Sequence, residues 1–310
     1  MDQNGHLALR RVCLLLLYTI LILHPSVDGG EAAERAGAVR FLADTISHGI
    51  RPHSRLEFSP DGRQIFWSGY VIGEGNTEWM FTSTWRGHEW TVPEIIPVNG
   101  GLGNGPALSP DGDRLFFGAE RPLEEGGPSY VGIWYADREG DGWAQVQPVE
   151  ATLDTTGFAG RPSLSRNGNL YYLVRGSISA IPAVARCRLE SGHYLEPELI
   201  GGALRGEIVL DPWIHPDEEF LLIMLDADLS DQPNHGSSDL FMVRSRSDDT
   251  WGPIANLGST VNTKHFDRSP SMSPDGEMLF FIRAVGNIFV ESDAHFYWQK
   301  WGEIPLSYVE

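Results

Sequence analysis

Lysine is almost absent from this 310-residue chain, because Lys264 and Lys300 are the only two. The chain carries 42 acidic residues against 23 basic ones, so its formal net charge is −19 at pH 7. Nucleic-acid binding needs clustered Lys and Arg that face the phosphates, so we expect no nucleic-acid partner. A strongly acidic surface otherwise favours solubility and names no ligand.

Cysteine is equally scarce, with only Cys13 and Cys187 in the chain. Cys13 lies in an apolar stretch at residues 13–23, which follows two arginines and precedes small residues. This order is typical of a secretory signal peptide, which we place at residues 1–29 with a flexible connector at 30–37. The stretch is shorter than the ~20 residues of a spanning helix, although an uncleaved N-terminal anchor stays open. We therefore expect a periplasmic or secreted protein without a stable membrane span after cleavage.

Long helical patterns are also missing, and short apolar runs bounded by turn residues take their place. The motif Ser-Pro-Asp-Gly occurs at residues 59–62, 109–112 and 273–276, with looser copies at 165–168 and 215–218. These copies begin 50, 56, 50 and 58 residues apart, a period typical of propeller blades or a repeat array. Pro at the second position and Gly at the fourth favour a type I turn between antiparallel strands.

Four apolar or aromatic runs accompany each turn and predict four strands per repeat. In the first repeat they lie at residues 56–58, 65–67, 79–81 and 90–92, and the third strand of the last repeat is expected at 288–290. Four-stranded repeats define propeller blades. We therefore predict an all-β fold, a β-propeller of five blades, with a sixth degenerate blade left open. The repeats lie near residues 54–98, 106–150, 161–201, 211–258 and 269–306 of a single domain at 38–310.

The last blade needs an outer strand, and residues 39–43 and 301–306 compete for that place. An N-terminal strand in that place would tie the two ends of the chain together and remove the open sheet edges that invite aggregation. We therefore predict a propeller that is closed by an N-terminal strand.

The repeat resembles a known family. Trp251-Gly252-Pro253-Ile254 leads into the turn at 273–276, and this pattern is similar to the WD40-like (PD40-type) repeat of exported bacterial β-propeller proteins related to TolB. The resemblance covers about residues 40–292, and the third and fourth repeats depart from it at Arg166-Asn167 and at His215 and Glu218. It implies a periplasmic or secreted binding or scaffold module without chemistry of its own. The motif is structural, so it predicts a fold and not a ligand.

Strand geometry predicts where a ligand site would lie. Side chains alternate between the two faces of a strand, and the residue just before each turn is apolar, so that face should pack between blades. The opposite face should look into a central channel. The residues expected at the mouth of this channel are Arg55, Glu57, Arg161, Asp211, Trp213, His53 and Asp267.

Such a set could bind a polar ligand, with arginines gripping a carboxylate and Trp213 stacking on it. A water-filled channel with compensated ion pairs is the structural alternative. The main functional prediction is a non-enzymatic binding or scaffold module for a protein, peptide or glycan, without a cofactor. The alternative is a secreted glycoside-active hydrolase, with Glu57, Asp211 and Asp267 as candidate axial carboxylates.

Metal binding has only a weak candidate, the acidic loop that contains Asp226, Asp228 and Asp231. Its spacing does not match the helix-loop-helix calcium motif, so a solvated loop is expected. The scattered histidines form no zinc pattern. Cys187 is expected to be a small buried hydrophobic residue.

Overall fold

A computed structural model describes residues 37–155, 157–176, 178–228, 230–247, 249–285 and 293–306. The predicted signal peptide at 1–29, the connector as far as residue 36 and the strand predicted at 288–290 lie outside these ranges. Across these ranges, the helices are too short and too polar to cross a membrane.

Each of the first two predicted repeats folds into a small antiparallel sheet. The first contains β2 (Ile50–Pro52), β3 (Glu57–Phe58), β4 (Gln64–Val71), β5 (Glu78–Thr84) and β6 (Glu94–Ile95). The second contains β7 (Asn104–Leu108), β8 (Arg114–Pro122), β9 (Ser129–Glu139), β10 (Gly142–Trp143) and β11 (Gln147–Pro148).

The remaining three repeats are built in the same way. The third contains β12 (Phe158–Leu164), β13 (Leu170–Arg175), β14 (Ala183–Cys187) and β17 (Glu198–Leu199), with β15 (Leu189–Glu190) and β16 (His193–Tyr194) as a separate hairpin. The fourth contains β18 (Val209–Ile214), β19 (Phe220–Asp226), β20 (Ser238–Ser245) and β21 (Trp251–Asn256). The fifth contains β22 (Phe266–Met272), β23 (Met278–Val285) and β24 (Asp293–Lys300).

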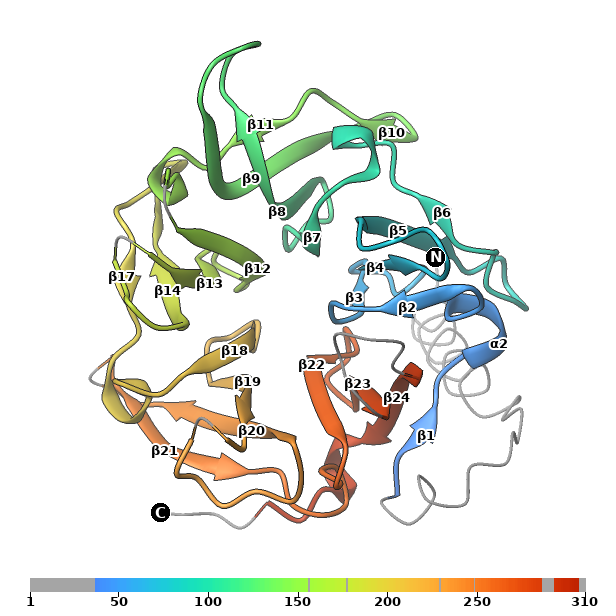
Figure 1. Cartoon of the computed structure of the whole chain (residues 1–310), viewed down its shortest axis with the longest axis vertical. Helices are drawn as coiled ribbons and strands as arrows, with labels where there is room; N and C mark the ends of the chain where they lie inside the picture. The colour runs from blue at the N-terminus through green and yellow to red at the C-terminus, as the bar shows by residue number, and fades with distance from the viewer. Residues whose placement is uncertain are drawn as a thin grey trace, which may run out of the picture.

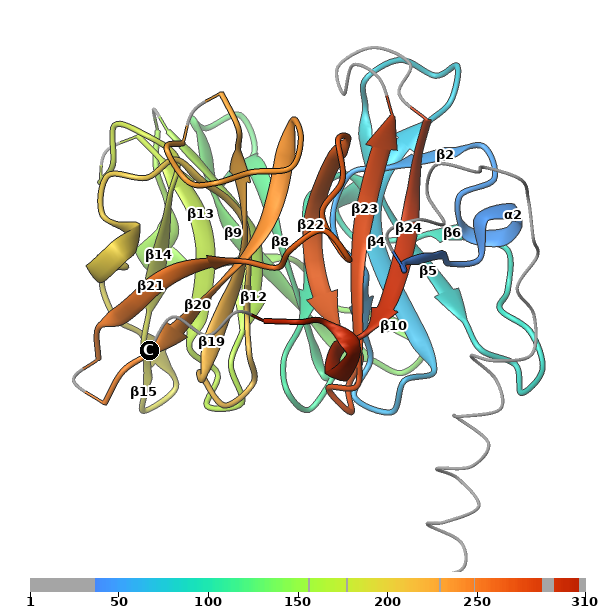
Figure 2. The same cartoon turned by 90° about the horizontal axis from the view of Figure 1, so that it is seen from below.

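The sheets stand around a common centre, as Figure 1 shows. The innermost strands are β3, β7, β12, β18 and β22, and the later strands of each repeat lie progressively further out. In the side view of Figure 2 the strands run between the two faces of the ring. Short radial sheets around one centre are the architecture of a β-propeller.

The short N-terminal strand β1 (Val39–Arg40) lies on the last repeat. It pairs antiparallel with β24 through Val39 opposite Trp298 and Arg40 opposite Tyr297. The competing C-terminal segment begins instead with a single 3-10 turn at Trp301–Glu303. The N-terminal segment is thus the partner of the last repeat, as the sequence predicted. It continues into the chain's one short α-helix within the described ranges, α2 (Ala43–Ile46).

The repeated tetrapeptide forms the turn between the first two strands of a repeat. Ser59 Oγ donates to Asp61 Oδ1 over 2.6 Å and accepts from the Gln64 amide over 2.9 Å, while the Gly62 amide donates to the Ser59 carbonyl. Gly62 has φ = +68°, a left-handed conformation that glycine adopts without a Cβ penalty. The looser copies close with the same backbone bond, from Gly168 to Ser165 and from Glu218 to His215.

Two of the aromatic residues predicted in the fourth strands are placed differently, whereas Trp251 begins β21 and pairs with β20 as the sequence predicted. Trp90 bridges Trp85 in a small hairpin, and the strand that pairs with β5 is β6, a few residues later. Tyr194 likewise lies in the hairpin β15–β16, whereas β17 pairs with β14. The outer strands of the first and third repeats therefore lie a few residues later than the sequence predicted, because Trp90 and Tyr194 take part in small hairpins instead.

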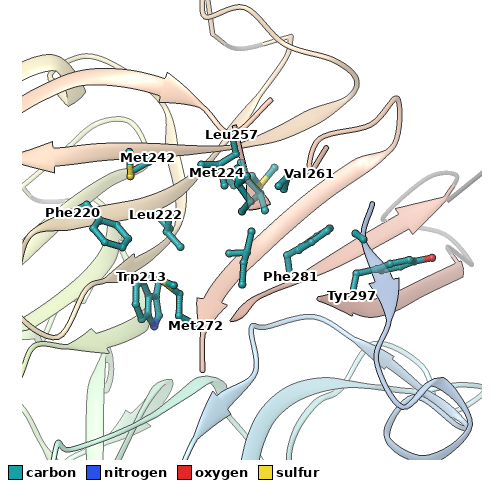
Figure 3. Packing of buried hydrophobic residues seen from close by; sticks show 14 residues of the cluster. Trp213, Phe220, Leu222, Met224, Met242, Leu257, Val261, Met272, Phe281 and Tyr297 are labelled. Atoms are coloured by element: carbon teal, nitrogen blue, oxygen red, sulfur yellow. The ribbon is translucent and has the colours of Figure 1, made fainter. Parts of the chain in front are cut away.

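The hydrophobic core is divided among the junctions between repeats. One cluster joins the fourth and fifth repeats through residues such as Leu222, Met242 and Phe281 (Figure 3). Another joins the fifth repeat to the first, with Phe280 and Phe296 against Ile65 and Trp67. Three further clusters of described residues join the other neighbouring pairs. Both faces of each sheet are therefore covered by neighbours, and only the edge of the innermost strand faces the centre.

Candidate functional site

A one-residue bulge interrupts the inner strand of four repeats, four residues before the turn begins. In β12 the partners shift between Gly160–Leu173 and Ser163–Tyr171, and β7, β18 and β22 shift at the equivalent place. The residues at this position have left-handed φ values of +48° to +58°: Gly105, Arg161, Asp211 and Ser269. Since a bulge re-aims a side chain, these residues leave the regular alternation and meet near the centre.

Arg55 occupies the same position in the first repeat and connects that repeat to two others. Its guanidinium donates to the carbonyl oxygens of Pro162 and Pro212, which belong to the third and fourth repeats. Its Nε lies 3.5 Å from Glu57 Oε2 in an ion pair, and the side chain is only 2% exposed. Burial lowers the pKa of Arg55, while the Glu57 charge opposes that shift. Arg55 therefore acts as a central tie between inner strands.

Arg161 and Asp211 form a second ion pair, with Nε 3.5 Å from Oδ1. Arg161 Nη1 also donates to the His53 carbonyl over 2.9 Å, and Ser269 Oγ donates to Asp211 Oδ2 over 2.7 Å. Burial acts to raise the pKa of Asp211, but the Arg161 charge and the Ser269 bond lower it overall. These contacts bring together groups from the first, third, fourth and fifth repeats.

Glu57 differs from Asp211 in its electrostatics. Burial raises its pKa, although the charge of Arg55 and the Leu108 amide oppose the rise. The Leu108 amide donates to Glu57 Oε1 over 3.3 Å, so this carboxylate also binds the inner strand of the next repeat. In the same way, Ser163 Oγ of the third repeat accepts a hydrogen bond from the Ile214 amide of the fourth over 3.0 Å. Glu57 keeps 18% of its side chain exposed.

His53 lies at the more accessible end of the cluster, with 26% of its side chain exposed. Its Nδ1 is 2.9 Å from Glu78 Oε1, and the Tyr70 hydroxyl is 3.3 Å from the same nitrogen. Burial and the nearby Arg161 charge lower the pKa of His53. Burial disfavours the Glu78 anion, but His53, Arg161 and a 2.5 Å bond from Ser68 Oγ lower the pKa of Glu78 to about 2.

Glu78 and Arg268 are central residues that the sequence reasoning missed. Both lie outside the positions two, four and six residues before a turn, because Glu78 begins β5 and Arg268 precedes the bulge in β22. One signal was available: Pro106, Pro162, Pro212 and Pro270 each follow the bulge position. Proline inside a strand is confined to edges and bulges, so this spacing indicates an interrupted edge strand.

Trp213 was predicted to face the channel, and this prediction was wrong. It is 8% exposed and packs with Phe220 and Met272 in the hydrophobic cluster between the fourth and fifth repeats (Figure 3). Its neighbour Ile214 packs on the opposite side, against the third repeat. The physical reason is that both faces of a blade meet another blade, so Trp213 offers no stacking surface to a ligand.

Asp267 was also misplaced by the alternation. It lies opposite Arg283 in the ladder of β22 and β23, and Arg283 Nε donates to its Oδ1 over 2.7 Å. Both side chains are almost fully buried, and Thr263 donates two further bonds to Asp267 Oδ2. Burial raises the pKa of Asp267 against the opposing charge of Arg283. This pair fixes the loop before β22, so Asp267 is not one of the central carboxylates.

The weak metal candidate was the acidic loop that contains Asp226, Asp228 and Asp231. Within the described part of the chain, no group of three or more His, Cys, Asp or Glu side chains is positioned to hold a metal ion. Asp226 Oδ1 instead accepts the Asp228 amide over 2.9 Å, which closes a local turn, and Asp231 joins no cluster with them. Cys187 is a free, buried thiol, and burial raises its pKa to about 12.

The arrangement gives an electrically balanced polar centre. Five of the seven predicted residues converge there: His53, Arg55, Glu57, Arg161 and Asp211. Glu78 and Arg268 complete a set of three carboxylates and three guanidiniums. Such a centre can present both donors and acceptors to a polar ligand, while Arg55 and Arg161 hold the inner strands together.

No family model matches the chain, and no curated protein matches it. Solved structures that it resembles include TolB from Acinetobacter baumannii, with 16% identity and a TM-score of 0.48 over 80% of this chain. An exo-1,5-alpha-L-arabinanase from a bovine ruminal metagenomic library has 12% identity and a TM-score of 0.47, covering 81% of this chain and 94% of that one. A protein of unknown function from Dyadobacter fermentans has 13% identity and a TM-score of 0.47, covering 79% and 75%.

The chain spans 54% of the TolB structure that it matches. At these identities and TM-scores, no activity carries over from any of these proteins to this chain. The class is therefore defined by the chain's own geometry: a β-propeller with a buried, charge-balanced centre.

Proposed function

We propose that this chain is an exported five-bladed propeller that acts as a non-enzymatic binding module for a protein, peptide or glycan. The five core clusters between neighbouring repeats support the blade number, and the pairing of β1 with β24 supports closure by the N-terminal strand. We propose export because residues 1–29 have the pattern of a signal peptide. We propose that residues 38–310 form the single propeller domain. The acidic composition argues against nucleic acid as the partner.

One observation carries the binding function: the cluster combines tightly held charges with an accessible end. Arg55 is 2% exposed and serves as a tie, whereas His53 and Glu78 keep 26% and 20% of their side chains exposed. Asp211 is held as a carboxylate by Arg161 and Ser269. Such preorganised groups bind a polar ligand without first having to be ordered. The ligand-binding residues we propose are His53, Arg161, Asp211 and Glu57, with Glu78 added.

The binding proposal is tested with peptide and glycan arrays probed by the mature protein. The parent protein should bind one ligand class, and His53→Gln should weaken that binding about tenfold or more, since it removes a polar contact at the accessible end. The matched control is His193→Gln, because His193 is exposed in the hairpin β15–β16. Equal binding by parent and His53→Gln, or no binding by the parent, would contradict the proposal.

A hydrolase remains the second candidate because of one specific observation. Glu57 has a raised pKa and Asp211 a lowered one, although both lie near Arg55. Two carboxylates whose pKa values are pushed apart are the usual basis of an acid and a base or nucleophile. Against this reading, each carboxylate is already paired with an arginine.

A panel of aryl glycosides and oligosaccharides separates the two functions. If the chain is a hydrolase, Glu57→Gln and Asp211→Asn should each abolish turnover while thermal unfolding stays cooperative. If the parent protein turns over no substrate on the panel, the hydrolase is rejected and the binding module stands.

A further inference from the structure

Arg268 is the one central guanidinium for which the structure shows no carboxylate within ion-pair distance among the described residues. It lies in β22 and is 6% exposed. Its Nη2 donates to the Pro52 carbonyl over 3.2 Å, and this is its single hydrogen bond to a described residue. Its buried Nε has no acceptor among the described residues. Leaving a buried charged donor unsatisfied is costly, so this group calls for an acceptor.

The neighbouring carboxylates are close enough to act on Arg268 but are engaged elsewhere. Asp211 and Glu78 both favour its charged form electrostatically. Asp211, however, accepts from Ser269 and pairs with Arg161, while Glu78 is bound by His53 and Ser68. Burial lowers the pKa of Arg268 to about 10, so it remains protonated at neutral pH. The nearby Arg161 charge is unfavourable to it.

An anion beside Arg268 would accept a hydrogen bond from its buried Nε and would also offset the repulsion by Arg161. A carboxylate can accept from the Nε and one Nη of a guanidinium in a bidentate pair, and its charge would offset the repulsion between Arg268 and Arg161. The Tyr70 hydroxyl and the partly exposed His53 ring both interact electrostatically with Arg268, and they lie 3.3 Å apart, from the hydroxyl oxygen to Nδ1. They add polar groups that can bind the rest of a small ligand.

We propose that Arg268 binds the carboxylate of a small ligand at the centre of the propeller. This inference rests on the proposed binding function and specifies its chemistry. The carboxylate can belong to a sugar acid or to the C-terminus of a short peptide, and the two sources share the group that Arg268 recognises.

Titration calorimetry with matched pairs of probes tests the proposal. D-glucuronate is compared with D-glucose, and N-acetylglycine with N-acetylglycinamide, so each pair differs in the carboxylate. We expect one acid to bind and its neutral partner to bind at least tenfold more weakly. Which acid binds identifies the source. Absence of binding by both acids at tens of millimolar, or equal binding of acid and neutral partner, overturns the proposal.

Variants connect the binding to this residue. Arg268→Gln should lower the affinity for the acid at least tenfold, because it removes the charged pair, and Arg268→Lys should lower it because a lysine cannot form the fork. Arg166→Gln is the matched control, since Arg166 is an exposed arginine paired with Asp217 on a turn. If Arg268→Gln does not fold, Arg268→Lys decides. Unchanged affinity in the folded variant means that the acid binds elsewhere and overturns the assignment.

Failure of the Arg268 proposal can be distinguished from failure of the proposed binding function. If the parent protein binds a ligand class on the arrays in a His53-dependent manner but binds no carboxylate probe, only the role of Arg268 fails. If it binds neither, both proposals fail.

Discussion

Three arginines with different surroundings share the centre of this molecule. Arg55 is held by two carbonyls and Glu57, and Arg161 by Asp211 and the His53 carbonyl, whereas Arg268 has a single carbonyl. Removing one partner of a buried ion pair leaves an uncompensated charge and is strongly destabilising. The sequence reasoning treated Arg55 and Arg161 as equivalent ligand-binding groups and missed Arg268, so it overlooked the division of the three arginines into two ties and one donor without a carboxylate partner among the described residues.

The contacts of Glu78 predict acid sensitivity. Its pKa of about 2 in the folded protein lies below the ordinary value of 4.5, so its stabilising contribution is complete above pH 4.5 and is lost as the pH falls towards 2. Glu78→Gln should lower the free energy of unfolding at pH 7 by about 3 kcal/mol and flatten its fall between pH 4.5 and 2. Urea unfolding across this pH range measures both effects. Glu74→Gln in the exposed loop of the same hairpin is the control, and the same slope in parent and Glu78→Gln proteins would contradict the prediction.

The bulged inner strand is the element that builds the site. In a regular strand, residues two apart share a face, and this rule led the sequence analysis to place Trp213 and Asp267 beside Arg161 and Asp211. The extra residue breaks the rule locally, so of the seven predicted residues only His53, Glu57 and those at the bulge position reach the centre, while Trp213 packs between blades.

Gly105 tests the close approach of two inner strands at this bulge. It has φ = +58°, and a Cβ there would lie 2.8 Å from the Arg161 Cα atom. Gly276 is also left-handed at φ = +72°, but a Cβ there meets nothing within 4 Å. Gly276→Ala should therefore cost about 1 kcal/mol of left-handed strain, and Gly105→Ala distinctly more, about 3 kcal/mol, because backbone atoms must also move. Chemical denaturation of the two variants measures the difference, and equal losses would show that the strands can separate freely.

The repeat units could be predicted from sequence far better than the site could. The turns recur as a local pattern with its own hydrogen bonds, from Ser59 to Asp61 and from Ser273 to Asp275, and local patterns are legible in sequence. The position of Glu78 and the pairing of Asp267 with Arg283 depend on which strands are neighbours in space. The two-residue outer strands β6 and β17 carry too little pattern to be placed. The prolines after the bulges were the signal that went unused.

At the scale of the whole molecule, the last repeat depends on a segment from the other end of the domain. Ala38, just before β1, joins the cluster between the fourth and fifth repeats, and Phe41, just after β1, packs edge-on against Phe280 with ring centroids 5.0 Å apart. The Phe41 amide also donates to the Phe296 carbonyl over 2.8 Å. The junction of first and last repeats is thus made of both hydrogen bonds and buried aromatic surface.

Phe41→Ala should weaken this junction specifically. Phe41 is 6% exposed, and truncating a buried phenylalanine costs about 3–5 kcal/mol, so the melting temperature should fall by several degrees. Limited proteolysis should then cut near residue 41 before it cuts elsewhere. Val39→Ala is the matched control two residues away, because Val39 is 41% exposed and should change stability by less than about 1 kcal/mol. Resistance of Phe41→Ala to both heat and protease, at the level of the parent, would show that β1 is dispensable.

The pairing of Val39 with Trp298 also has a kinetic consequence. A ribosome makes Val39 long before Trp298, so Val39 must wait unpaired until the strands that lie between them in the sequence have been made. Contacts so distant in sequence form slowly because a very long loop must close. The intermediate repeats can form their hairpins meanwhile, which leaves one late docking event to convert an open arc into the native molecule.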